Sequence, residues 1–189
     1  MDPLSGVGIG LYDASALERV IDDMAHRLAA LLQGCERLAV IGILRRGAPL
    51  ADRLSDRLVR QHGVVRPLRL DLAVSRYADD LSLLHPETRL TEDASAARVD
   101  LSRHVLLVVD DVLYSGHSLL RVVAHLARRQ ADEIRSAVLV DRGVSRMPVR
   151  ADVVGVRLEL APTDIIECHV PPYEPDFGIQ LRRLPPAPG

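Results

Sequence analysis

The sequence of 189 residues contains no lysine and no asparagine, so all 24 of its basic residues are arginines. The absence of lysine excludes a Schiff-base mechanism, which needs a lysine amine. It also excludes a Walker-type phosphate loop, which uses a lysine to reach the phosphates. If the chain binds a phosphate group, that group must therefore meet arginine, backbone N–H groups or a metal ion.

Cysteines, long apolar runs and excess charge are also scarce. Cys35 and Cys168 stand far apart without CxxC or Cys/His spacing, so we expect inert core thiols rather than a disulfide framework or a zinc site. The apolar runs are short, and the N-terminus lacks a basic segment followed by an apolar one. We therefore predict no membrane span and no signal peptide, and expect a cytoplasmic protein. The net charge of −2 gives no global case for nucleic-acid or membrane binding, although a local basic face remains open.

The spacing of apolar residues predicts a single α/β domain over residues 1–189. We expect a helix at 14–33, opened by a capping box of Ser15 and Glu18, and further helices at 48–61 and from 119 onward. We expect strands at 38–44, 64–74, 104–109, 136–140 and 152–158. Residues 75–103 lack sustained periodicity, which is typical of a functional flap. The proline-rich tail at 161–189 cannot be a regular helix, and we expect an edge strand or a subunit contact there.

Two consecutive acids follow the clearest predicted strand. Asp110 and Asp111 come after an apolar run and before a short loop, Ser115-Gly116-His117-Ser118, that opens a helix. Ligands of open α/β sheets bind beyond the carboxyl ends of the strands, and the N–H groups of a helix N-terminus suit a phosphate monoester. The two carboxylates suit the hydroxyls of a phosphorylated sugar and the waters of a hard cation such as Mg²⁺. The alternative is that both acids only end a buried strand and cap the next helix.

The segment Asp110-Asp111-Val112-Leu113-Tyr114-Ser115-Gly116-His117-Ser118 resembles the phosphoribosyl-diphosphate motif of type I phosphoribosyltransferases. It is most similar to the pyrimidine operon regulator family, which carries Asp-Asp-Val-Leu-Tyr-Thr-Gly-Arg-Thr. The resemblance implies a central, mainly parallel sheet flanked by helices, with a small hood and a mobile flap. It also implies that Asp110 and Asp111 are the catalytic and Mg²⁺-binding pair. The residues implied to bind the phosphoribosyl group are Val112, Leu113, Tyr114, Ser115, Gly116, His117 and Ser118.

Four positions of this motif carry information about the ligand. Ser115 and Ser118 keep the hydroxyl groups of the family's threonines, whereas His117 replaces an arginine and loses its permanent positive charge. This replacement predicts weaker or pH-sensitive phosphate binding. Purine-salvage relatives usually carry aspartate at the position of Tyr114, so the tyrosine favours a pyrimidine base.

Residues 42–54 resemble the diphosphate loop of the same family and the helix that follows it. The resemblance implies that Arg45, Arg46 and Gly47 bind pyrophosphate and that Arg46 contacts it as the leaving group. It also implies a non-proline cis peptide near Arg45-Arg46. The alternative is an ordinary pair of surface arginines after a strand.

Two further segments resemble the flap and the base-binding hood of the family. In residues 75–81 the implied flap residues are Arg76, Tyr77, Asp79 and Asp80, with Ala78 where the family has an arginine. In residues 137–143 and 147–155 the resemblance implies that Arg142 lies near the base and that Val153 and Val154 form its slot. The alternatives are solvated loop acids, a surface ion pair between Asp141 and Arg142, and ordinary core valines.

Three functions fit these features. The first is transfer of a phosphoribosyl group from 5-phosphoribosyl diphosphate to uracil, which gives UMP and pyrophosphate with Mg²⁺ as cofactor. The second is a nucleotide sensor that binds the messenger RNA leader of pyrimidine genes through an arginine patch. Candidates for that patch are Arg19, Arg27, Arg128, Arg129, Arg146 and Arg150. The third is transfer to a purine or another base, which Tyr114 disfavours. The family's habit of self-association predicts a homo-oligomer, either a dimer or a larger assembly.

Overall fold

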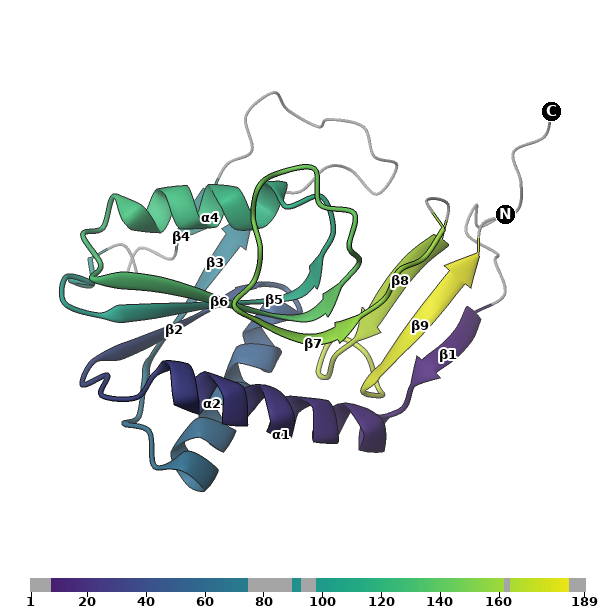
Figure 1. The fold of residues 1–189 in the computed structure, drawn as a ribbon, viewed down its shortest axis with the longest axis horizontal. Helices are drawn as coiled ribbons and strands as arrows, with labels where there is room; N and C mark the ends of the chain where they lie inside the picture. The colour runs from purple at the N-terminus through teal and green to yellow at the C-terminus, as the bar shows by residue number, and fades with distance from the viewer. Residues whose placement is uncertain (1–7, 75–89, 93–97, 162–163, 184–189) are drawn as a thin grey trace.

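The computed structural model describes residues 8–74, 90–92, 98–161 and 164–183, and Figure 1 shows its elements. The helices are α1 (Ala14–Leu31), α2 (Gly47–His62) and α4 (His117–Ala127). The strands are β1 (Gly8–Tyr12), β2 (Leu38–Leu44), β3 (Leu68–Val74), β4 (Leu90–Glu92), β5 (Val105–Leu113), β6 (Glu133–Asp141), β7 (Val153–Arg157), β8 (Asp164–His169) and β9 (Gly178–Arg183). None of the described helices is both long and apolar enough to cross a bilayer.

The main sheet has the strand order β4-β3-β2-β5-β6-β7, and only β4 runs antiparallel to its neighbour. Helices α1 and α2 cover one face of this sheet and α4 covers the other (Figure 1). β2 and the first five residues of β5 are apolar because both of their faces are buried. Leu107 and Val109 of β5 pack in the core cluster of α1 and α2, whereas Leu106 and Val108 pack in that of α4. The predicted fold, a mainly parallel sheet flanked by helices, is therefore confirmed.

The two ends of the described chain form a second, antiparallel sheet in the order β1-β9-β8. It is joined to the main core, because Cys168, Val170 and Ile179 belong to the same buried cluster as α1 and α2. The expected edge strand in the tail is thus confirmed as β8. The two segments that resemble the base-binding hood, residues 137–143 and 147–155, belong to the main sheet and the loop beside it rather than to this small sheet. They include the end of β6 and the start of β7, which pair in parallel.

Helix α1 begins differently from the prediction. Its N-cap is Asp13, whose carboxylate accepts a hydrogen bond of 2.8 Å from the N–H of Ala16. The predicted capping box of Ser15 and Glu18 is therefore wrong, since Asp13 takes the capping position two residues earlier. Ser15 instead accepts a hydrogen bond of 3.0 Å from Arg19.

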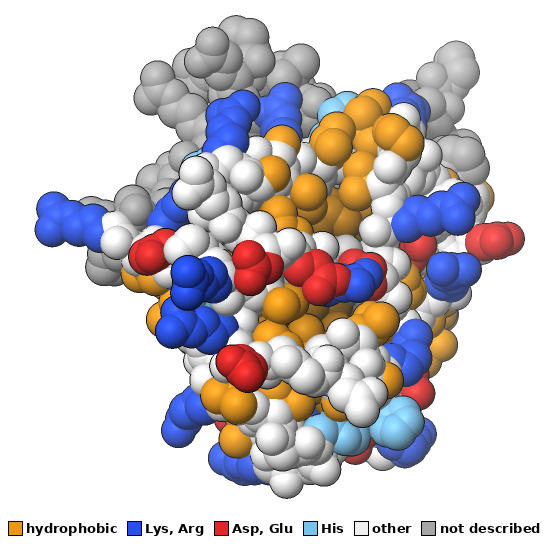
Figure 2. Space-filling model, turned by 60° about the vertical axis from the view of Figure 1, so that its left-hand side comes forward, with side chains coloured by type: hydrophobic (Ala, Val, Ile, Leu, Met, Phe, Trp, Pro, Cys, Tyr) orange, Lys and Arg blue, Asp and Glu red, His pale blue; other side chains and the backbone are white. Residues whose placement is uncertain are grey.

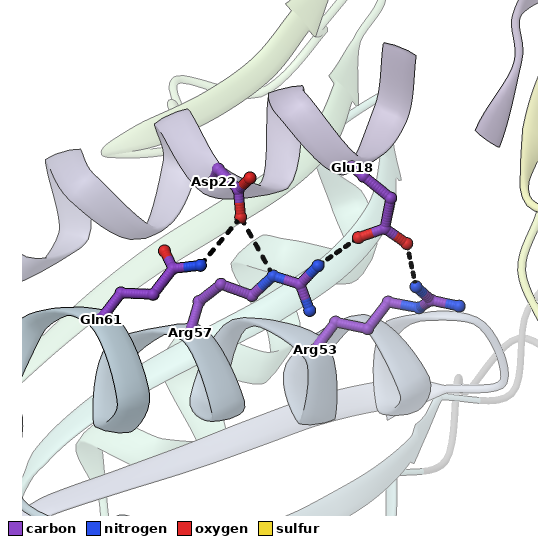
Figure 3. A network of polar contacts seen from close by, with 5 residues as sticks. All are labelled: Glu18, Asp22, Arg53, Arg57 and Gln61. Carbon is purple, nitrogen blue, oxygen red and sulfur yellow. Dashed lines mark hydrogen bonds and ion pairs between the residues drawn. The ribbon is translucent and has the colours of Figure 1, made fainter. Parts of the chain in front are cut away.

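Glu18 links α1 to α2 through a polar network drawn in Figure 3. Its carboxylate binds Arg53 at 2.5 Å and also pairs with Arg57. Asp22, one turn further along α1, accepts hydrogen bonds from Arg57 at 3.1 Å and from Gln61 at 3.3 Å. The partners on α2 recur at four-residue spacing and so lie on one face of that helix, which fixes how the two helices lie side by side.

Two strands differ in length from the sequence-based prediction. Strand β3 begins at Leu68 rather than at residue 64, because Pro67 has no N–H with which to join the sheet. Strand β5 does not end at Val109 but continues to Leu113, which pairs with Asp141 of β6. The two acids and the two residues after them, which were predicted to follow the strand, therefore lie within it.

Candidate functional site

The acidic pair lies inside β5 rather than beyond its end. Asp110 and Asp111 are each only 4% exposed. Consecutive residues on a strand point to opposite faces, yet the charges of both carboxyl groups reach the buried thiol of Cys168. The Asp110 carboxylate accepts a hydrogen bond of 2.9 Å from the N–H of Asp111. Two adjacent acids buried in the central strand are costly for stability, which makes them candidates for a functional site.

The rest of the predicted phosphate segment divides between strand, turn and helix. Val112 and Leu113 lie in β5, and their side chains pack with the two core clusters. Gly116 is the N-cap of α4 at φ 85°, and His117 is the first residue of the helix. Ser115 and His117 are joined by a hydrogen bond of 3.0 Å between Oγ and Nδ1. The strand, short turn and helix N-terminus are therefore arranged as an anion site requires.

The loop after β6 packs against this turn. The N–H of Arg146 donates to the carbonyl oxygen of Ser115 at 3.0 Å. A Cβ at Gly116 would lie 2.6 Å from Oγ of Ser145 and 3.2 Å from Cβ of Met147. Glycine is required at this position both for its positive φ and for this close approach.

The predicted diphosphate loop connects β2 to α2 and lies beside the acidic pair. Its non-proline cis peptide is Leu44-Arg45, one bond before the predicted position. Gly47 at the start of α2 abuts β5, because a Cβ there would lie 2.5 Å from the carbonyl oxygen of Val109 and 3.2 Å from Cα of Asp110. The structure thus brings together two predicted segments that are more than 60 positions apart in the sequence.

Arg46 of this loop is held by a residue that the sequence analysis missed. Its Nε and Nη2 atoms donate to Oε1 of Glu174 at 3.0 and 2.5 Å. The hydrogen bond with Glu174 raises the pKa of Arg46, and the negative charge of Asp111 acts in the same direction. Arg45, by contrast, is exposed. Arg46 is therefore a half-exposed arginine with a fixed partner, and its role toward pyrophosphate remains a prediction. No local pattern marked Glu174, which is a single acid between prolines.

Cys168 lies buried next to these charged groups. Burial raises the pKa of its thiol well above the ordinary value, and the charges of Asp111 and Asp110 raise it further. Burial also raises the pKa of Cys35. Both cysteines are free thiols and neither is favoured as a thiolate, which agrees with the prediction that they are inert.

Arg142 and Tyr114 form the stacked pair of the site. Arg142 is 4% exposed, and its Cζ lies 4.7 Å from the centre of the Tyr114 ring, which is 45% exposed. Nη2 of Arg142 donates to the carbonyl oxygen of Ala161 at 3.3 Å, while its buried Nε has no hydrogen-bond partner among the described residues. Asp141 instead accepts from the N–H of Gly143 at 2.9 Å. The alternative of a surface ion pair between Asp141 and Arg142 is therefore wrong.

The structure gives less information on the other residues that were predicted to bind the base or to form the flap. The side chains of Val153 and Val154 are buried in the two core clusters, and the carbonyl oxygen of Val154 accepts a hydrogen bond of 2.7 Å from Arg27. Their role toward a base remains a prediction. The flap residues Arg76, Tyr77, Asp79 and Asp80 lie outside the described residues.

The site therefore consists of a strand with two buried acids, a turn that opens a helix, and a second loop that packs against that strand in a mainly parallel sheet. The model of the phosphoribosyl transferase domain matches residues 10–176. The chain therefore belongs to the phosphoribosyl transferase domain family.

Individual relatives agree with this assignment. The bifunctional protein PyrR of Caldicellulosiruptor bescii is 31% identical over 177 residues, which cover 92% of this chain and 94% of the relative. The bifunctional protein PyrR of Deinococcus deserti is 36% identical over 160 residues, covering 83% and 85%. The hypoxanthine phosphoribosyltransferase of Trypanosoma cruzi superposes with a TM-score of 0.73 at 19% identity and covers 93% of this chain and 97% of that one. The last comparison supports the fold alone.

Proposed function

We propose that this protein transfers the phosphoribosyl group of 5-phosphoribosyl diphosphate to uracil and releases UMP and pyrophosphate. The observation that carries the proposal is the contact of Gly47 with Val109 and Asp110, which brings the diphosphate loop beside the acidic pair. One ligand that carries a phosphate, a ribose and a diphosphate can then meet the turn at Ser115, the acids of β5 and Arg46 together. The protein need not form a covalent bond with the substrate, because orientation and charge neutralisation lower the barrier to loss of pyrophosphate.

Each segment has a separate role in this proposal. The turn and helix N-terminus at residues 115–118 bind the 5′-phosphate through backbone N–H groups and hydroxyls. Asp110 and Asp111 bind the ribose hydroxyls and a magnesium ion. Arg46, with the backbone of Arg45 and Gly47, binds the pyrophosphate that leaves.

Mg²⁺ fits the donor set of this site. Among the described residues, no group of three or more His, Cys, Asp or Glu side chains could hold a metal by itself. Mg²⁺ is usually held by one or two carboxylates together with waters and substrate phosphates, which is what Asp110 and Asp111 with a bound diphosphate would supply. When bound, the ion would neutralise the charge that develops on pyrophosphate.

The stacked pair supports a small base. The exposed ring of Tyr114 lies on the buried guanidinium of Arg142, whose Nε lacks a partner among the described residues. A base with carbonyl oxygens, such as uracil, could accept a hydrogen bond from such a donor. Similarity to PyrR proteins over most of the chain agrees with a pyrimidine base. We further propose that the protein is cytoplasmic and that it forms a homo-oligomer.

The test is a substrate panel with purified protein, Mg²⁺ and 5-phosphoribosyl diphosphate. We expect uracil to be converted faster than hypoxanthine, guanine or adenine, and removal of Mg²⁺ with EDTA to abolish turnover. Asp111→Asn should lose turnover, whereas Asp56→Asn, which changes an exposed acid of α2, should not. Preference for a purine would favour the third function, and no conversion of any base would contradict catalysis.

A second candidate function is an RNA-binding regulator that senses nucleotide, and similarity to PyrR proteins favours it. The candidate arginines do not form one surface, because Arg19 and Arg27 lie on α1 whereas Arg128 and Arg129 follow α4 on the opposite face of the sheet (Figure 1). On the face drawn in Figure 2, arginines are spread around the rim among acidic side chains. A gel shift with leader RNA, with and without UMP, that weakens steeply with salt would support this function. No shift at low salt would contradict it.

A further inference from the structure

The contact between Arg46 and Glu174 joins the diphosphate loop to the C-terminal part of the chain. The two residues are 128 positions apart, and the guanidinium donates two hydrogen bonds to one carboxylate oxygen. The Glu174 side chain is 18% exposed and that of Arg46 is 39% exposed, so the pair is partly shielded from water. Such a pair is stronger than a fully exposed one, which contributes little.

Glu174 is itself held in place. Its second carboxylate oxygen accepts a hydrogen bond of 2.8 Å from the N–H of Val170, and its own N–H donates to the carbonyl oxygen of Val170 at 3.4 Å. A second contact anchors the same turn, because Cζ of Arg53 lies 4.4 Å from the centre of the buried Phe177 ring. The turn at 170–177 is therefore held by Arg46 just before α2 and by Arg53 within α2, and the carboxylate has a defined position.

The contact constrains Arg46 without using all of its donors. Nε and Nη2 bind Glu174, whereas Nη1 makes no hydrogen bond with any described residue. A free arginine side chain has many rotamers, and a fixed partner removes much of that freedom before a ligand arrives. The remaining N–H groups of the planar guanidinium then keep a fixed direction from which to meet a second anion.

We propose that Glu174 is a positioning residue that holds Arg46 ready for the pyrophosphate group of the substrate. This inference rests on the proposed function, because it assigns Arg46 to pyrophosphate. It gives the proline-flanked turn of the tail a role in the reaction, although that turn does not touch the reacting atoms. The opposing reading is that Glu174 stands in for pyrophosphate and must be displaced by it.

The test is calorimetric titration of the full chain with pyrophosphate in the presence of Mg²⁺. We expect Glu174→Ala to weaken binding about tenfold, as loss of one charge-assisted interaction predicts. Glu174→Gln should lose less, since its amide oxygen still accepts a hydrogen bond. Because Glu174 acts through Arg46, the double variant with Arg46→Ala should bind no worse than Arg46→Ala alone. The matched control is Glu167→Ala. It removes another ion pair, in which Nε of Arg182 lies 2.8 Å from Oε2 of Glu167 in the small sheet.

The outcomes distinguish failure of the role of Glu174 from failure of the proposed transferase function. Tighter binding by Glu174→Ala or Glu174→Gln would show a competing carboxylate and overturn the inference, as would full additivity in the double variant. If Glu174→Ala does not fold, the binding constant of Glu174→Gln decides, because it keeps the shape of the side chain. If the wild-type protein binds no pyrophosphate with Mg²⁺, the proposed function fails first and the role of Glu174 fails with it.

Discussion

Replacement of Gly47 by alanine should damage the site by steric contact alone. The added Cβ would lie 2.5 Å from the carbonyl oxygen of Val109, about 0.9 Å short of the 3.4 Å at which ordinary contact begins. It would also lie 3.2 Å from Cα of Asp110. Both neighbours are backbone atoms of the central strand and cannot rotate away. The start of α2, with the diphosphate loop before it, must therefore move away from the acidic pair.

The size of that movement sets the expected loss. Insertion of a methyl group into a packed site costs about 1–3 kcal/mol of stability. A displacement of roughly 1 Å in a catalytic arrangement can cost about 100-fold in rate. We expect Gly47→Ala to lose stability in this range and to lose about 100-fold in kcat/KM for 5-phosphoribosyl diphosphate. Urea unfolding and a coupled assay of pyrophosphate release measure the two effects.

Gly10→Ala provides the control for this experiment. A Cβ at Gly10 of β1 would meet no atom within 4 Å, and its φ is not in the left-handed region. Both substitutions restrict the unfolded chain by the same amount, which by itself stabilises a protein by about 0.4–1 kcal/mol. The difference between the two variants therefore isolates the contact with β5. Equal stability and equal kcat/KM in the two variants would refute the steric argument.

Three further predictions concern the cap of α1, the Glu174 contact and the phosphate turn. Asp13→Ala should lower the free energy of unfolding by about 0.5–2 kcal/mol in urea unfolding, since it removes the cap on the Ala16 N–H, and an unchanged value would contradict that role. Burial raises the pKa of Glu174, but hydrogen bonds from Arg46 and Val170 outweigh it, so the pKa of Glu174 is lowered. The ionised carboxylate therefore stabilises the folded protein above pH 4.5, and this stabilisation is lost as the pH falls through the lowered pKa. Unfolding measured on both sides of that window should show a smaller loss for Glu174→Gln than for wild type, and equal losses would contradict this sign. His117→Arg should bind 5-phosphoribosyl diphosphate severalfold more tightly in calorimetry because it adds a permanent cation at the helix N-terminus, and weaker binding would show that the contact with Ser115 matters more.

Local patterns in the sequence predicted most of the main sheet. The continuous apolar run at 38–44 gave the bounds of β2 to the residue, because a strand buried on both faces needs no polar alternation. The acids at 110 and 111 were identified with the correct strand, but its end was placed four residues too early. Charged residues normally end a buried strand, and here hydrogen bonding to β6 continues through them as far as Leu113.

Contacts between distant segments could not be predicted in this way. β1 pairs with β9 across almost the whole chain, and the short five-residue β1 is largely exposed, so it carries little periodicity. The Arg46–Glu174 pair is likewise a contact across 128 positions, and the sequence around neither residue indicates the other as its partner. The resemblance to the family covered only residues up to about 160, so no motif identified Glu174.

Charged groups from these distant segments all act on the buried thiol of Cys168. The charged groups that act on its thiol are Asp110, Asp111, Glu174 and Arg46, so three carboxyl groups lie near one guanidinium around a buried side chain. In their ionised forms the three carboxyl groups would repel pyrophosphate, whereas Arg46 would attract it. An anionic substrate can therefore be expected to bind here only together with a cation, and Mg²⁺ supplies two positive charges. Under the proposed function, Glu174 would fix Arg46 in direction, and Mg²⁺ would supply the positive charge that Arg46 alone does not.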